Sequence, residues 1–149
     1  MRLSGTHTFN APRERVWTML NDIDALRTLI PGVESLEEVE PNTYKGVAKI
    51  GIAGVKGEYT GTVRLSEINP PESYRLSGEG RGKPGHVKGE GSLRLTEDAP
   101  GTTTLHYTGD LQVGGMIAGV GQRLIEGAAK LLIGQGLKAL AQRVEQQPA

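Results

Sequence analysis

Two hydrophobic periodicities divide the chain. Apolar and polar residues alternate at every second position through much of its length, which is typical of strands with one buried face. From about residue 116 to 145, apolar residues recur every third or fourth position, which indicates one long amphipathic helix. The alternating segments, predicted as strands, are 2–9, 33–40, 43–52, 55–68, 73–82, 86–97 and 102–113, and shorter helical patterns cover 10–20 and 22–30.

Short turns rich in proline, glycine and asparagine separate the six later strands, so consecutive strands should pair antiparallel. A sheet with one apolar face must cover that face, and the C-terminal helix is the only large element available. The pattern predicts an α+β fold: a strongly curved antiparallel seven-stranded sheet gripping a long C-terminal helix, with two short helices after strand 1. Residues 1–149 show neither an internal repeat nor a second domain and are predicted to form a single domain.

The apolar face of the predicted sheet contains a surplus of glycine. The chain has 22 glycines in 149 residues, against about 7% in an average protein. Each glycine in the apolar phase forgoes about 1.5–3 kcal/mol that a buried valine or leucine could contribute. Eight glycines share this phase: Gly46, Gly57, Gly61, Gly78, Gly80, Gly89, Gly91 and Gly109.

Two interpretations of these glycines remain open. Glycine permits bulges, bends and the close approach of a helix. It could instead leave a cavity between sheet and helix, and pockets for small molecules are mostly apolar with few polar groups. The cavity hypothesis predicts that Gly61→Leu or Gly91→Leu fills the space while folding survives. The helix face expected to look at the sheet contains Gly121, Ile125, Ala128, Leu132, Gly136 and Ala139.

The candidate ligand-binding residues follow from the cavity hypothesis. Tyr59, Tyr107 and His7 would orient the polar end of a ligand, and the uncharged start of the last helix would form the mouth or contact a partner or membrane surface. The cavity itself is expected between Val63, Leu93, Leu95, Leu105, Ile125 and Leu132. The full candidate set is His7, Gly57, Tyr59, Gly61, Val63, Tyr74, Gly89, Gly91, Leu93, Tyr107, Met116, Ile117, Val120, Leu124, Ile125 and Ala128.

Charge and composition narrow the function classes. Lys plus Arg and Asp plus Glu both number 17, so the basic footprint of a nucleic-acid-binding protein is absent and no nucleic-acid partner is predicted. The chain has no cysteine, which excludes disulfides and thiolate metal ligands. The first residues lack the apolar run of a signal peptide, and the longest uncharged stretch near the C-terminus, 111–122, is shorter than the ~20 residues of a membrane span. We therefore expect a soluble, cytoplasmic protein.

No catalytic constellation and no metal site can be recognised in the sequence. His86 lies beside a predicted turn, and His106 lies on the solvent-facing side of a predicted strand. No predicted helix carries His or carboxylate residues at the spacing of metal ligands. The glycine-rich segment 78–85 lacks the strand-to-helix context of a phosphate loop. We expect no catalytic residue, no metal and no cofactor other than a bound apolar ligand.

Several segments resemble one known family. They are "FNAPRERVWTMLNDIDALRTLIPGVESLEEV" (9–39), "GEYTGTVRL" (57–65), "GEGSLRL" (89–95) and "TTLHYTGDLQVGGMIAGVGQRLIEGAAKLL" (103–132). In this order they resemble the carbon monoxide dehydrogenase G-subunit family, within the START-related SRPBCC superfamily of helix-grip proteins. The resemblance implies one START-like domain with an apolar ligand groove under the long helix. It also implies a non-catalytic accessory protein for a molybdenum hydroxylase of the carbon monoxide dehydrogenase type.

The leading hypothesis is therefore a carrier of a hydrophobic small molecule, such as a lipidic quinone. It would also dock the hydroxylase at the inner face of the cytoplasmic membrane. A second hypothesis is an assembly or interaction protein with a packed interior and no ligand. A third is a polyketide cyclase-like enzyme on the same scaffold, which would need an inward acid–base pair.

Overall fold

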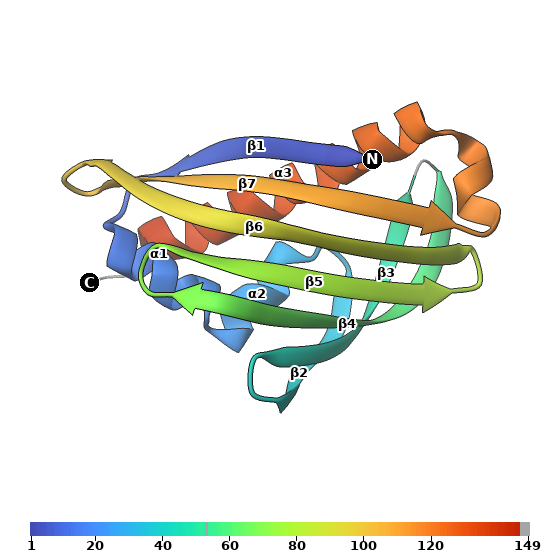
Figure 1. Cartoon of the computed structure of the whole chain (residues 1–149), viewed down its shortest axis with the longest axis horizontal. Coiled ribbons are helices and arrows are strands. Elements are labelled where there is room, and N and C mark those ends of the chain that lie inside the picture. Colours follow the sequence, from blue (N-terminus) through green and yellow to red (C-terminus); the bar gives the residue numbers. More distant parts are fainter. Residues whose placement is uncertain (53, 147–149) are drawn as a thin grey trace.

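The computed structural model describes residues 1–52 and 54–146, which form a sheet wrapped around one long helix (Figure 1). The order of elements is strand, two short helices, six strands, a 3₁₀ turn and the long helix, as the periodicity predicts. The elements are β1 (Arg2–Phe9), α1 (Arg13–Leu20), α2 (Ile23–Leu29), β2 (Val33–Glu40), β3 (Thr43–Ile52), β4 (Val55–Asn69), β5 (Ser73–Gly82), β6 (Gly85–Ala99), β7 (Thr102–Gly114), η1 (Met116–Val120) and α3 (Gln122–Gln146).

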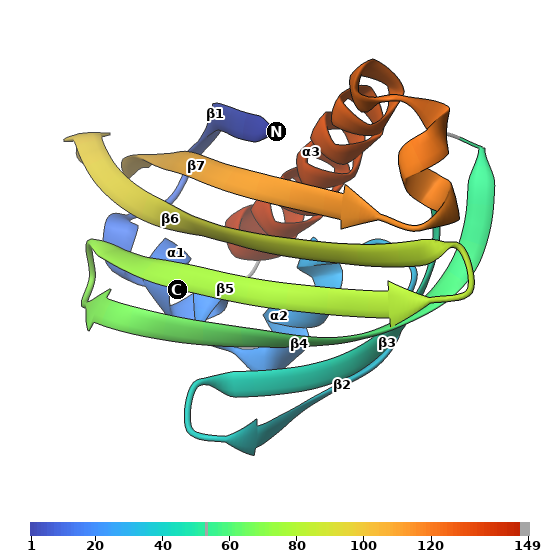
Figure 2. The ribbon, with the colours of Figure 1, turned by 45° about the vertical axis from the view of Figure 1, so that its right-hand side comes forward.

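The seven strands form one antiparallel sheet in the order β1-β7-β6-β5-β4-β3-β2. Strand β1 therefore pairs with the last strand, and the six later strands form the predicted meander. Figure 2 shows the sheet curving so that α3 lies across its concave side. The predicted α+β fold, an open, curved seven-stranded sheet gripping a C-terminal helix, is confirmed.

A packed core fills the concave face on the side of α1 and α2. Phe9, Leu95 and Leu140 are at most 1% exposed there. The Trp17 and Tyr74 rings pack with centroids 5.6 Å apart, which joins α1 to the sheet. The buried members of this core are Phe9, Ala11, Val16, Leu20, Ala25, Leu36, Tyr44, Leu65, Tyr74, Leu93, Leu95, Leu105, Leu137, Leu140, Ala141 and Val144.

The last helix begins later than predicted, and its buried face matches the predicted one only in part, at Ile125 and Gly136. Gly121 has a positive φ of 101°, a conformation that glycine adopts without strain and that ends the 3₁₀ turn before α3 starts. Gly121 is exposed rather than facing the sheet, so the predicted uninterrupted helix and this inward position are wrong. The fully buried residues of α3 are Ile125, Gly136, Leu137, Leu140, Ala141 and Val144.

Candidate functional site

The inward-facing glycines form a diagonal band across the sheet. In the strand register Gly61 lies between Gly46 and Gly80, so three neighbouring strands lack a side chain in one row. The next row pairs Gly78 with Gly89, and the row after it pairs Gly91 with Gly109. Gly5 of β1 continues the diagonal, opposite Tyr107. We call the set Gly5, Gly46, Gly61, Gly78, Gly80, Gly89, Gly91 and Gly109 the glycine band.

Several of these glycines allow neighbouring strands to approach closely. A methyl group added at Gly46 would lie 2.5 Å from the Ser35 carbonyl oxygen, and one at Gly61 would lie 2.8 Å from the Glu79 carbonyl oxygen. A methyl group at Gly91 would meet the Thr108 carbonyl oxygen. These contacts involve backbone, which cannot move away cheaply. These contacts argue against the prediction that Gly61→Leu or Gly91→Leu leaves folding intact, and they favour the geometric interpretation at these three positions.

Other glycines of the band border empty space. A methyl group at Gly80 would find no atom nearer than 3.9 Å, and one at Gly109 would make an ordinary contact of 3.4 Å. Leu76, which faces the same concave side in the row of Gly91 and Gly109, still exposes 37% of its surface. An inward-facing leucine with this exposure shows that the space in front of it is not filled by the protein's own atoms.

This space is an apolar cavity of about 450 Å³ between the glycine band and α3. Its floor is the concave face of β4 to β7 together with Leu3 of β1, and Leu29 of α2 and Ile133 and Leu137 of α3 close it from the helical side. The inward-facing residues of the floor are Val63, Leu76, Gly78, Gly80, Val87, Gly89, Gly91, Leu93, Leu105, Tyr107, Gly109 and Leu111.

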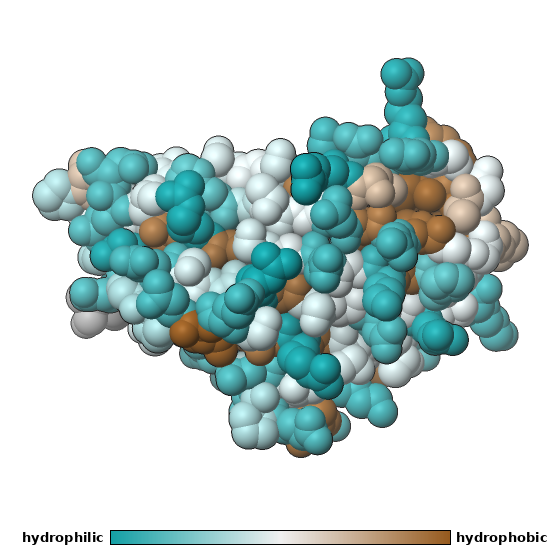
Figure 3. Space-filling view, viewed as in Figure 1, coloured by the Kyte–Doolittle hydropathy of each residue, from teal (hydrophilic) through white to brown (hydrophobic). Residues whose placement is uncertain are grey.

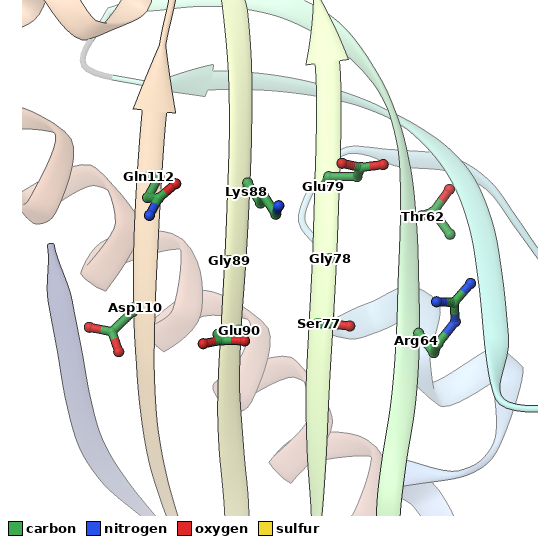
Figure 4. A pocket seen from close by; sticks show the side chains of 10 residues that line it. All are labelled: Thr62, Arg64, Ser77, Gly78, Glu79, Lys88, Gly89, Glu90, Asp110 and Gln112. Carbon is green, nitrogen blue, oxygen red and sulfur yellow. The ribbon is translucent and has the colours of Figure 1, made fainter.

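A second hollow lies on the opposite face of the same strands. Its volume is about 380 Å³, and it shares the backbone at Gly78, Glu79, Gly89 and Glu90 with the inner cavity. Figure 4 shows the charged side chains of this hollow, with the helices behind the sheet. The sheet at the glycine band is therefore a single backbone layer that separates an apolar interior from a polar outer surface.

The structure brings only part of the predicted site together. Val63, Gly89, Gly91, Leu93 and Tyr107 line the cavity. Of the residues expected around the cavity, Leu105 also lines it, whereas Leu95, Ile125 and Leu132 do not. Candidates outside the lining are His7, Gly57, Tyr59, Gly61, Tyr74, Met116, Ile117, Val120, Leu124, Ile125 and Ala128.

The remaining tyrosines and His7 occupy other surroundings. Tyr74 belongs to the packed core, where burial first and the nearby Tyr44 second raise its pKa strongly. Burial also raises the pKa of Tyr59, whose buried hydroxyl has no hydrogen-bond partner within the described residues. His7 faces inward on the edge strand but packs edge-on against Phe9, with ring centroids 4.9 Å apart. Among the three predicted polar handles, only Tyr107 reaches the cavity lining.

The residues predicted as a mouth, Met116, Ile117 and Val120, belong to η1 itself, at one end of the sheet. Ile117 is fully buried, and its backbone N–H donates a 2.7 Å hydrogen bond to the Pro84 carbonyl oxygen. Gly57 lies under the Pro84 ring, at a separate hollow beside the β3–β4 hairpin. Met116 and Leu124 are 69% and 60% exposed. These residues form a closed end with an apolar outer surface, not the cavity lining.

Sequence reasoning missed part of the lining. Leu3, Leu29, Ile133 and Leu137 belong to three elements whose position over the sheet is set by packing. The alternation places Leu3 on the inward face, but the cavity's proximity to the N-terminal strand cannot be read from it. The helical periodicity misses Ile133 and Leu137, because it places the inward face about one residue out of register.

Comparisons with known proteins agree with this architecture. The family model for the G subunit of carbon monoxide dehydrogenase (CoxG) matches residues 5–145. A conserved protein from Geobacillus kaustophilus superposes with a TM-score of 0.93 at 38% identity, over 97% of this chain and 95% of that chain. A START superfamily protein from Mycobacterium smegmatis gives 0.74 at 18% identity, over 97% of both chains.

One solved relative is an enzyme. The Zhui aromatase/cyclase from a Streptomyces species superposes with a TM-score of 0.72 at 17% identity, over 98% of this chain and 94% of that chain. At this identity the similarity shows the shared fold alone. A search of curated proteins found no significant match.

Proposed function

This chain belongs to the carbon monoxide dehydrogenase G-subunit (CoxG) family, and within that family we propose for it a non-catalytic role in binding an apolar small molecule. The molecule would be a lipidic quinone or a similar lipid-like compound, held between the glycine band and α3. The protein would serve a molybdenum hydroxylase of the carbon monoxide dehydrogenase type. It would do so at the inner face of the cytoplasmic membrane.

The cavity is the observation that carries this proposal. Its volume of about 450 Å³ falls in the range of small-molecule sites, about 300–1,000 Å³, and its apolar lining is typical of them. Leu76 and Leu111 would lose their contact with water when a ligand enters. Burial of apolar surface contributes about 25 cal/mol per Å², so an apolar guest is favoured without any charged partner.

Gly80→Leu and Gly109→Leu test the cavity directly. Both positions have room for a Cβ atom, so the leucine side chain should enter the cavity while the backbone stays in place. We expect both variants to fold and to lose binding of decylubiquinone, measured by displacement of Nile red. Gly134→Leu is the matched control, because Gly134 lies on the exposed side of α3 with no atom within 4 Å.

Native mass spectrometry of protein taken from cell extract separates a carrier from a ligand-free assembly protein. If the protein is a carrier, the parent and the Gly134→Leu variant should each retain a lipid-like adduct, and the Gly80→Leu variant should not. If the parent protein carries no adduct and binds no decylubiquinone, the carrier proposal fails and the assembly role is favoured. If a polyketide-like compound is converted rather than released unchanged, the cyclase-like alternative replaces the accessory role.

The membrane part of the proposal rests on the surface around η1. Ile117 joins η1 to the β5–β6 hairpin through Pro84, and Pro84 also covers Gly57 beside the β3–β4 hairpin. Figure 3 shows apolar residues gathered at this end, beside the segment running from β7 into η1. We call the exposed residues Lys56, Lys83, Met116, Arg123 and Leu124 the η1 surface.

The η1 surface combines positive charge with exposed apolar side chains. The turns at the other end of the strands carry Glu67, Glu72, Glu97 and Asp98, of which Glu67 is paired with Arg75. The turns at the two ends of the strands therefore differ in charge, although the formal net charge of the whole chain is zero. Anionic lipids attract basic residues by about 1 kcal/mol each near the surface, and Met116 and Leu124 could insert between headgroups. Within the described residues, no helix is both long and apolar enough to cross a bilayer.

Vesicle flotation tests this surface. We expect the protein to float with phosphatidylglycerol vesicles more than with phosphatidylcholine vesicles, and less at high salt because exposed charges are screened. Lys83→Glu and Met116→Asp should each reduce flotation, whereas Lys138→Glu, on an exposed part of α3 outside the η1 surface, should not. Equal flotation with both lipids, or none with either, would contradict docking by this surface.

A further inference from the structure

Tyr107 depends on a glycine of the neighbouring strand for its position. The two residues lie opposite each other in the β1–β7 pair. A methyl group added at Gly5 would lie 2.5 Å from the Tyr107 hydroxyl oxygen and 2.7 Å from Cζ. The tyrosine ring therefore lies across Gly5, at the β1 edge of the cavity. Because the obstructing atoms belong to the end of a side chain, substitution at Gly5 should displace the ring rather than the backbone.

The Tyr107 hydroxyl is the feature of the lining that could contact the polar part of a ligand. It makes no hydrogen bond to another group in the described part of the chain. Tyr107 lines the cavity, whereas Tyr59 and Tyr74 do not. Tyr107 thus supplies a side-chain hydroxyl donor on the inward-facing part of the lining.

The cavity offers no balancing positive charge. Among its lining residues the charged ones are Glu79 and Glu90, and both belong to the outward phase of their strands. Figure 4 shows their side chains on the outer face of the sheet. A carboxylate that entered the cavity would be buried without a cationic partner, which carries a large desolvation cost. The lining therefore disfavours fatty acids and other anions.

We propose that the cavity selects uncharged ligands that carry a carbonyl or similar acceptor, and that Tyr107, positioned by Gly5, donates a hydrogen bond to this acceptor. The inference rests on the proposed ligand-binding function and specifies the chemistry of the ligand. Gly5 acts as a positioning residue through the tyrosine ring. Gly80 and Gly109, by contrast, leave space in the apolar part of the same site.

Three compounds of similar size test the proposal: 2-undecanone, undecane and decanoate, each displacing Nile red at pH 7.5. The native protein should bind the ketone most tightly and decanoate least. Tyr107→Phe should weaken ketone binding about three- to tenfold, the range of one hydrogen bond between neutral groups, and leave undecane within twofold. Gly5→Ala should give the same selective loss, and the double variant should lose no more than Tyr107→Phe alone.

Two results would overturn this inference about Tyr107 but would leave the proposed ligand-binding function intact. One is an equal effect of Tyr107→Phe on ketone and hydrocarbon, or no effect on either. The other is decanoate binding as tightly as the ketone. Absence of binding by all three compounds and by Nile red would instead overturn the proposed function on which the inference rests. Tyr107→Phe keeps the test decisive if Gly5→Ala impairs folding, because it adds no atom.

Discussion

The same strands fill the concave face of the sheet in two different ways. On the side of α1 and α2, strand β6 contributes Leu95 to a closely packed core, and Leu93 lies at the boundary, in both the core and the cavity lining. A few residues earlier, the same strand contributes Gly89 and Gly91 to the glycine band and borders a cavity. The alternation of inward and outward residues continues unchanged through both regions. The difference lies in what the inward positions carry, so one region provides stability and the other provides space.

The comparison also shows that the glycines serve two purposes. Gly46, Gly61 and Gly91 face backbone carbonyl groups of the neighbouring strand, so their role is to allow the strong coiling of the sheet. Gly80 and Gly109 have room around them. Curvature and cavity are therefore connected, because the coil that the first group permits creates the concave space that the second group leaves open.

The largest expected effect comes from truncating one leucine in each region. Leu95 is 1% exposed in the packed core, so Leu95→Ala should lower the free energy of unfolding by about 2–5 kcal/mol. Leu111 lines the cavity and is half-buried, so Leu111→Ala should cost only about 1 kcal/mol. Urea unfolding followed by circular dichroism measures both. Similar losses would mean that the cavity side packs as tightly as the core.

Much of this architecture could be predicted from the sequence. The alternating segments predict all seven strands and their inward faces, because burial on one face of a strand imposes a period of two. The inward glycines indicate where side chains are missing. Val63, Leu93 and Tyr107, three members of the predicted site, lie in the cavity lining because the alternation places them on the inward face.

The other predictions failed where tertiary packing decides. Tyr59 shares the inward phase of Val63, but it lies nearer the β3–β4 hairpin and is buried outside the cavity lining. The predicted inward face of α3 is only partly right: Ile125 and Gly136 are buried, but Gly121 interrupts the helix and is exposed, a break that the periodic pattern does not reveal. The role of Gly5 also escapes sequence analysis, since it depends on the register between the first and last strands.

A smaller effect distinguishes the two partners of one glycine pair. Gly91 and Gly109 lie opposite each other in the β6–β7 ladder. A methyl group at Gly91 would meet the Thr108 carbonyl oxygen and lie 3.0 Å from the Gly109 Cα. Gly91→Ala should therefore cost about 1–3 kcal/mol through overpacking.

Gly109→Ala is the matched partner of this experiment. Its new methyl group makes an ordinary contact, and alanine reduces the entropy of the unfolded chain. We expect its free energy of unfolding to stay within about 1 kcal/mol of the parent. Thermal or urea unfolding of both variants would reveal the asymmetry. Equal costs at the two positions would show that the division of the glycines into coiling and space-making groups is wrong.

The smallest effect tests whether the packed core is sealed from water despite the cavity beside it. Burial raises the pKa of Tyr74 above its ordinary value of about 10. The unfolded chain therefore loses the tyrosine proton at lower pH than the folded protein, so the stabilisation is complete below pH 10 and is lost as pH rises above it. The loss attributable to Tyr74 should approach about 1.4 kcal/mol per pH unit. Urea unfolding between pH 8 and 11 should show a shallower decline for Tyr74→Phe than for the parent. An identical decline in both proteins would mean that water from the cavity reaches the Tyr74 hydroxyl, and that the boundary between the two regions does not exclude solvent.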